Sequence, residues 1–137
     1  MESATLQLQM TDDGNELNGV SLLVVEDDYL VAADMCSALM RRGAVIIGPA
    51  GNLRRAHELL RQHRPDCALL DLNLSGELAF ELAAEFERAG VPTIFTTGYD
   101  AAFFPESLRG SPCVQKPVNF KVLVQSILTR SRPGLSA

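Results

Sequence analysis

The sequence LLVVEDD, at residues 22–28, has four apolar residues directly before three acidic ones. Four further short, mostly apolar runs occur along the chain, at residues 44–47, 67–70, 92–96 and 112–115. Runs this short, apolar at both alternating positions, are typical of strands that are buried on both faces of a parallel sheet. We therefore predict five strands, one at each run.

Helical signals fill the segments between these runs. Asp28, Asn52 and Asn119 stand where N-cap residues are expected, and apolar side chains recur at helical spacing after each of them. Residues 100–110 allow only a short or irregular fourth helix, because Pro105 and Gly110 interrupt the pattern. The alternation predicts an α/β fold, in which a five-stranded parallel sheet has helices on both faces. The other predicted helices are residues 28–42, 52–64, 77–89 and a last one from residue 119 onward.

Polar side chains occupy the carboxyl ends of the predicted strands, where open α/β sheets place their functional crevice. Glu26 and Asp27 follow the first strand, Asp71 the third, Thr97 the fourth and Lys116 the fifth. Three carboxylates at one edge repel each other, which makes their ionisation costly. A hard divalent cation relieves this repulsion, and carboxylate oxygens with water suit Mg2+. The sequence therefore predicts a magnesium pocket that also contains a hydroxyl group and an ammonium group.

Four motifs carry a resemblance to a known family. They are VVEDD at 24–28, LLDLNL at 69–74, FTTG at 95–98 and Lys116-Pro117. In this order, on successive strand ends, they resemble the CheY-like receiver domain of bacterial two-component response regulators. The resemblance extends from about Val20 to Arg130. It implies a flavodoxin-like fold and a signalling module controlled by phosphorylation, not a metabolic enzyme.

The resemblance also implies roles for individual residues. Asp71 would accept a phosphoryl group from a histidine kinase or a phosphotransfer protein. Thr97 would donate a hydrogen bond to this group, and Lys116 would pair with it. Mg2+ is the implied cofactor, and its implied ligands are Glu26 through water, Asp27, Asp71 and the backbone carbonyl of Asn73.

Several features depart from the usual receiver pattern. FTTGY at 95–99 resembles the FATGUY signature of a group of single-domain receivers, and DLNLSGE at 71–77 lacks the usual proline after the acceptor. Cys113 stands where typical receivers have the aromatic residue that couples phosphorylation to the output face, and a cysteine is too small for this role. We hypothesise that residues 98–110 carry the conformational change instead. The Lys116–Pro117 peptide is expected to be cis, as in similar receivers.

Composition suggests the limits of the domain and its partners. The polar, acidic residues 1–18 are expected to be a flexible leader, residues 19–131 the receiver domain, and residues 132–137 a tail. The net charge of −5 argues against nucleic acid as a partner. The clustered arginines are interpreted as solvated surface residues; they are Arg41, Arg42, Arg54, Arg55 and Arg61.

The remaining features are expected to serve the fold. Three cysteines without CxxC spacing are interpreted as core residues of a reduced, cytoplasmic protein. Neither a signal pattern nor an apolar run of membrane length is present, so no membrane partner is expected. His57 and His63 are expected on the surface, and Gly48-Pro49 is expected to form a turn.

Three functions remain open from sequence. We expect no output domain after the last predicted helix, so a stand-alone receiver would act on a downstream regulator by protein contact, or would drain phosphoryl groups. A receiver that binds partners without phosphorylation is the first alternative. A phosphohydrolase that uses an aspartyl-phosphate is the second, but it needs an acid two residues after the nucleophile, where this chain has Asn73.

Overall fold

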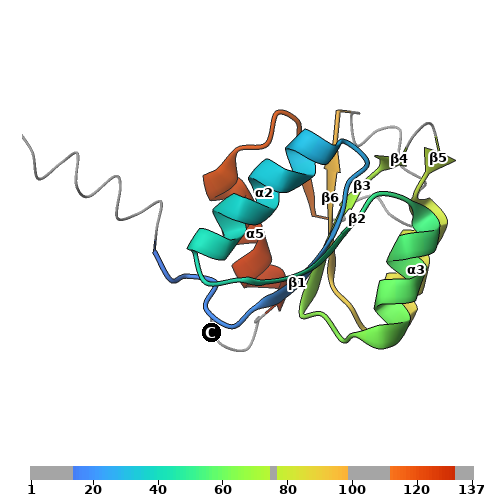
Figure 1. The fold of residues 1–137 in the computed structure, drawn as a ribbon, viewed down its shortest axis with the longest axis horizontal. Helices are drawn as coiled ribbons and strands as arrows, with labels where there is room; N and C mark the ends of the chain where they lie inside the picture. The colour runs from blue at the N-terminus through green and yellow to red at the C-terminus, as the bar shows by residue number, and fades with distance from the viewer. Residues whose placement is uncertain (1–13, 75–76, 99–111, 132–137) are drawn as a thin grey trace, which may run out of the picture.

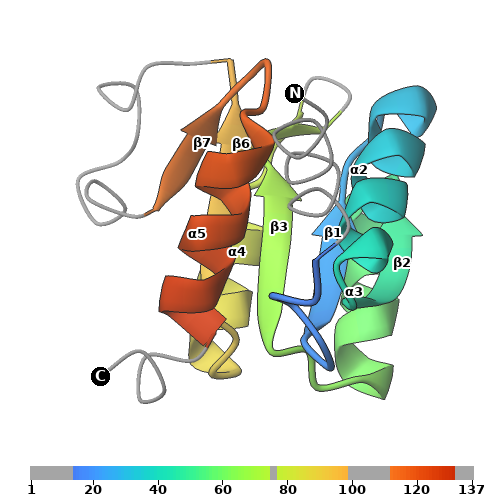
Figure 2. The ribbon, with the colours of Figure 1, turned by 90° about the vertical axis from the view of Figure 1, so that its left-hand side faces the viewer.

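A five-stranded parallel sheet forms the centre of the computed structural model, which describes residues 14–74, 77–98 and 112–131. The strands are β1 (Ser21–Val25), β2 (Val45–Ala50), β3 (Cys67–Asp71), β6 (Thr93–Thr97) and β7 (Cys113–Gln115). Their order is β2-β1-β3-β6-β7, and every neighbouring pair is parallel. Figure 2 shows β2 and β7 at opposite edges. The predicted α/β fold is confirmed.

Helices cover both faces of this sheet. Figure 1 shows α2 and α5 on one face and α3 on the other. The elements are α2 (Tyr29–Arg41), α3 (Leu53–Gln62), α4 (Phe80–Arg88) and α5 (Phe120–Ser131). Leu22 and Val24 of β1 pack in the core with α2 and α5, whereas Leu23 and Val25 pack in the core with α3 and α4. Both alternating positions of the strand are therefore buried, as its apolar run predicted.

Side-chain caps begin three of the helices where the sequence predicted them. Asp28 Oδ1 accepts hydrogen bonds from the backbone N–H groups of Leu30 and Val31, at 3.0 and 3.2 Å. Asn52 Oδ1 accepts one from Arg55 N at 2.8 Å, and Asn119 Oδ1 accepts one from Val122 N at 3.1 Å. Each cap satisfies a backbone donor that the first helical turn leaves without a partner.

Two predicted boundaries were wrong. The helix predicted from residue 77 begins at Phe80, because Glu77–Leu78 (β5) pairs antiparallel with Asn73–Leu74 (β4). The second strand does not end in a turn at Gly48-Pro49 but continues to Ala50. Its register shifts there, with Gly48 at φ +98°, a conformation that glycine adopts without strain. The predicted fourth helix, at 100–110, lies outside the described residues.

Residues 14–18 pack against the domain, although we predicted them to belong to the flexible leader. Leu17 is fully buried, and its N–H donates to the carbonyl of Arg42 at 3.0 Å. Arg42 is also buried, which corrects its interpretation as a solvated residue. Its Nη1 lies 2.9 Å from Glu16 Oε2, and its guanidinium lies 4.7 Å from the centroid of the Phe120 ring. These contacts compensate for the loss of water around the guanidinium.

The other arginines of the cluster and the three cysteines were also assigned to the surface or the core from sequence. Arg41, Arg54, Arg55 and Arg61 are exposed, as predicted. Cys36 and Cys67 are buried and Cys113 is half-buried, and all three are free. In the parts of the chain that the structure describes, no helix has the length and apolarity to cross a membrane.

The Glu16–Arg42 pair gives a first testable prediction. In Glu16→Gln, a buried guanidinium loses its charged partner, so we expect the free energy of unfolding to fall by about 1–3 kcal/mol. Glu58→Gln is the matched control, because it breaks the exposed Arg55–Glu58 pair, and we expect a change within about 0.5 kcal/mol. Urea denaturation measures both. Equal losses in the two variants would contradict the structural role given to Glu16.

Candidate functional site

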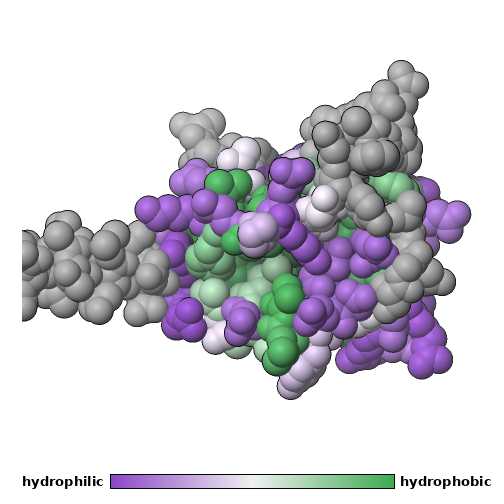
Figure 3. Space-filling view, turned by 90° about the horizontal axis from the view of Figure 1, so that it is seen from above, coloured by the Kyte–Doolittle hydropathy of each residue, from purple (hydrophilic) through white to green (hydrophobic). Residues whose placement is uncertain are grey.

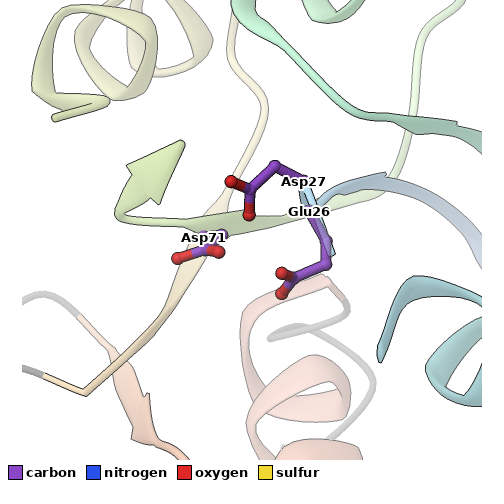
Figure 4. A group of neighbouring side chains, drawn as sticks. All are labelled: Glu26, Asp27 and Asp71. Carbon is purple, nitrogen blue, oxygen red and sulfur yellow. The ribbon is translucent and has the colours of Figure 1, made fainter. Parts of the chain in front are cut away.

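Three carboxylates meet at the carboxyl ends of β1 and β3. Glu26 and Asp27 directly follow β1, and Asp71 is the last residue of β3. The two strands are neighbours, with Val25 paired to Leu70, so the residues that follow lie side by side. One carboxylate oxygen from each of the three acids lies within 4.8 Å of the other two. Figure 4 shows the three side chains converging on one space.

Burial differs among the three acids. Glu26 is 3% exposed and Asp71 4% exposed, whereas Asp27 is exposed. The cluster therefore has a buried bottom, formed by Glu26 and Asp71, and a side that is open to solvent at Asp27. A reactant from solvent can reach the cluster on the side of Asp27. At the buried bottom of the pocket, little water screens the charges of Glu26 and Asp71, so their interactions with other charges are strong.

Lys116 brings a positive charge to the buried bottom of the pocket. It follows β7, and its backbone N–H donates to the Thr97 carbonyl at 2.8 Å, which extends the pairing of β6 and β7 by one residue. Its Nζ lies 3.0 Å from Asp71 Oδ2 and 3.2 Å from Glu26 Oε1. The Lys116–Pro117 peptide is cis, as predicted.

The other two predicted site residues lie beside Asp71. The backbone N–H of Asn73 donates to Asp71 Oδ1 at 3.1 Å, which fixes one carboxylate oxygen while Lys116 binds the other. Thr97 is buried at the end of β6, one residue beyond Thr96, which pairs with Asp71. All six residues that the sequence singled out therefore lie at one end of the sheet.

Burial and neighbouring charges shift the pKa values of Glu26 and Lys116. Burial is the main reason that the pKa of Glu26 rises to about 7; the N–H of Asp28 lowers it, and the charge of Asp71 raises it further. Burial alone would lower the pKa of Lys116, but the hydrogen bond and charge of Asp71, followed by the charge of Glu26, raise it overall. Sequence reasoning did not find the Lys116–Glu26 pair, because β1 and β7 are not neighbours in the sheet.

The arrangement fits a hard divalent cation. Glu26 Oε1 is buried and accepts no hydrogen bond, although the Lys116 ammonium lies at ion-pair distance from it. Together with Asp27 and Asp71 it offers only oxygen donors, two of them on buried carboxylates. Mg2+ and Ca2+ prefer such ligands, and Mg2+ in particular keeps several waters, for which the open side of the cluster provides access.

The raised pKa of Glu26 gives a second prediction, for protein in EDTA. The folded state binds this proton more tightly than the unfolded state, whose pKa is near 4.5. The stabilisation is therefore complete below pH 4.5 and is lost as the pH rises through about 7. Over this range we expect wild type to lose up to about 3 kcal/mol relative to Glu26→Gln. Urea denaturation at several pH values measures this difference. Parallel pH profiles for the two proteins would contradict it.

The fold and the site together define a class of protein: a doubly wound parallel sheet with an acid cluster and a lysine at its carboxyl edge. Residues 22–128 match the family model described as "Response regulator receiver domain". The chain therefore belongs to the response regulator receiver domain family, and its predicted resemblance to CheY-like receivers is confirmed.

Relatives and solved structures agree with this assignment. The chain is 33% identical over 115 residues to the sensory transduction protein LytT of Bacillus cereus, covering 79% of this chain and 46% of LytT. It is 26% identical over 110 residues to the transcriptional regulatory protein PdtaR of Mycobacterium tuberculosis, covering 77% of this chain and 54% of PdtaR. The chain thus spans about half the length of the curated relatives it matches.

One solved structure matches over its whole length. It is the signal receiver domain of a modulated diguanylate cyclase from Desulfovibrio desulfuricans G20, described as "an example of alternate folding". The TM-score is 0.75 at 30% identity, and the match covers 88% of this chain and 100% of that one. The match therefore extends over a complete receiver domain of that protein.

Proposed function

We propose that Asp71 accepts a phosphoryl group from a histidine kinase or a phosphotransfer protein, and that this modification switches the domain in a two-component phosphorelay. One observation carries the proposal: the Asp71 carboxylate belongs to the acid cluster and lies 3.0 Å from the Lys116 ammonium, at the carboxyl end of the sheet. A carboxylate attacks phosphorus effectively only when the charge on the phosphoryl oxygens is neutralised. The Lys116 ammonium is one group that can do this, and the acid cluster offers oxygen ligands for a divalent cation that would do the same.

The residues have distinct roles in this proposal. A carboxylate oxygen of Asp71 forms the new bond to phosphorus, while the bond from phosphorus to the donor histidine breaks and its electron pair returns to the imidazole. Lys116, which already contacts Asp71, stabilises the negative charge on the transferred group. Thr97 donates a hydrogen bond to that group. To bind the phosphoryl oxygens, Lys116 must give up part of its contact with Asp71.

Mg2+ is the cofactor that the donor set supports. Glu26, Asp27, Asp71 and the carbonyl of Asn73 would hold it, with Glu26 acting through water. When bound, the ion offsets the repulsion between the Asp71 carboxylate and the phosphoryl oxygens. The residues of the chain position the nucleophile, exclude water from the base of the pocket and fix one oxygen of Asp71 through the Asn73 N–H.

The downstream step is part of the same proposal. We infer that the receiver acts alone, by contact with a regulator protein or by draining phosphoryl groups, as the resemblance to the FATGUY group suggests. We hypothesised that residues 98–110 carry the conformational change. Residues 99–110 lie outside the described residues, so this hypothesis stays a prediction. Cys113 packs at the edge of the core with α3 and α4, which suits a packing role for this small residue.

Labelling with acetyl phosphate tests the proposal. With Mg2+ and 32P-labelled acetyl phosphate, we expect one label per chain, released by hydroxylamine as an acyl phosphate is, and we expect none in EDTA. A label that resists hydroxylamine would contradict an aspartyl phosphate. Repeated turnover on phosphate esters would favour the phosphohydrolase, and an unlabelled protein that still binds a regulator would favour the phosphorylation-independent receiver.

A further inference from the structure

Exposed apolar side chains gather on one side of the domain. Among the described residues, six large hydrophobic side chains are exposed, and five of them belong to α2 or α5. Tyr29 and Leu30, at the start of α2, are 79% and 72% exposed. Figure 3, seen from the strand ends, shows a hydrophobic region bordered by hydrophilic side chains. An apolar region of this kind on a small domain indicates a surface that something covers.

An open groove of about 540 Å³ runs along this side, between α2 and the segment that joins β7 to α5. Its apolar lining comes from Val31, Met35 and Ala38 of α2, and from Pro117, Val118 and Phe120 on the opposite wall. Its charged lining consists of Arg41 and Arg42 at the end of α2, Lys116 of the candidate site, and one acid, Asp34, nearer the start of α2. The groove therefore connects the end of α2 with the acid cluster.

The described chain begins beside this groove. Residues 14–18 contact Arg42, through the Glu16 carboxylate and through the N–H of Leu17. The 13 residues before Gly14 thus start close to one end of the groove. From Arg42 back to Val31, α2 rises about 16 Å, whereas eight extended residues span about 26 Å. Residues 6–13 are long enough to run the length of the groove.

The composition of that segment complements the lining. Asp12 and Asp13 precede the anchoring residue Glu16 and would lie near Arg41 and Arg42. Leu6, Leu8 and Met10 alternate with polar residues, so an extended chain presents all three on one face. The order along the chain, acids first and then apolar residues, matches the order along the groove from the arginines toward Val31.

We propose that residues 6–13 occupy the groove between α2 and the β7–α5 segment, with Leu6, Leu8 and Met10 against its apolar lining and Asp12 and Asp13 beside Arg41 and Arg42. The contact does not depend on the proposed function.

Nuclear magnetic resonance of the unphosphorylated full chain tests the contact. We expect nuclear Overhauser effects between the methyl groups of Leu8 and those of Val31 or Val118. We also expect the triple substitution Leu6→Ser, Leu8→Ser and Met10→Ser to shift the signals of Val31, Val118 and Phe120. The matched control substitutes the alternate positions, Thr5→Ser, Gln7→Ser and Gln9→Ser, and should leave those signals in place.

Three results would overturn the proposal. The first is the absence of these Overhauser effects, with the signals of Val31, Val118 and Phe120 unshifted in both triple variants. The second is a set of groove signals that move on dilution but not on the apolar substitutions, which would assign the groove to a second copy of the chain. The third is equal shifts in both variants. Because no phosphoryl donor is present, none of these results depends on whether Asp71 is an acceptor.

Discussion

Asp71→Asn is expected to take up no label from acetyl phosphate in the presence of Mg2+. An amide oxygen is a much poorer nucleophile than a carboxylate, and the substitution also removes one of the three acids of the cluster. We expect incorporation to fall from about one phosphoryl group per chain to background. The measurement is 32P incorporation followed on a denaturing gel, with circular dichroism to establish that the variant is folded.

Asp34→Asn is the matched control for this experiment. Asp34 is an exposed aspartate on α2, outside the acid cluster, so its variant should take up label at the wild-type rate. Label that persists in Asp71→Asn would place the acceptor elsewhere, and Asp27 would then be the first residue to test. Loss of label in both variants would indicate a general effect of the substitutions and not a specific acceptor.

The parts of this fold that could be predicted from sequence are those that local patterns determine. Each strand of the parallel sheet is buried on both faces, so its composition alone separates it from the amphipathic helices. The helix caps were equally predictable, because the side chain of Asn52 bonds a backbone group only three residues away. Since parallel strands end at one edge, the strand assignment also placed the acids, Thr97 and Lys116 together.

The features that sequence reasoning missed depend on contacts between distant residues. Arg42 has the sequence surroundings of a solvated helix end, and only the folding of Glu16 and Phe120 onto it makes it a buried residue. The pairing of β4 with β5 replaces the first turn of a helix that the apolar spacing had predicted from residue 77. Within the candidate site, the contact of Lys116 with Glu26 depends on how far a lysine side chain reaches across the sheet end.

These differences affect how the site works. A lysine that pairs with Asp71 alone would simply move to a phosphoryl group once it arrived. A lysine held by two buried carboxylates instead balances the charge of the whole base of the pocket. Its removal should therefore affect stability as well as chemistry, and the two effects can be measured separately.

Lys116→Met is expected to lower the rate of labelling by acetyl phosphate about 100-fold or more, because a preorganised cation no longer stabilises the transferred group. In EDTA we also expect the free energy of unfolding to fall by about 3 kcal/mol, because two buried carboxylates lose their charged partner. Lowering the pH should reduce this loss, since protonation of Glu26, whose pKa is about 7, removes one of the two charges. Labelling kinetics and urea denaturation at pH 5 and pH 8 measure these effects.

Lys121→Met separates the role of Lys116 from the chemistry of the substitution. Lys121 is exposed on α5, so the same replacement should leave both labelling and stability near wild type. If Lys116→Met lost stability but kept the labelling rate, Lys116 would only balance the charge of the pocket and would take no part in transfer. If it lost labelling at unchanged stability, the paired carboxylates would not depend on Lys116, and the two ion pairs at 3.0 and 3.2 Å would contribute only to transfer.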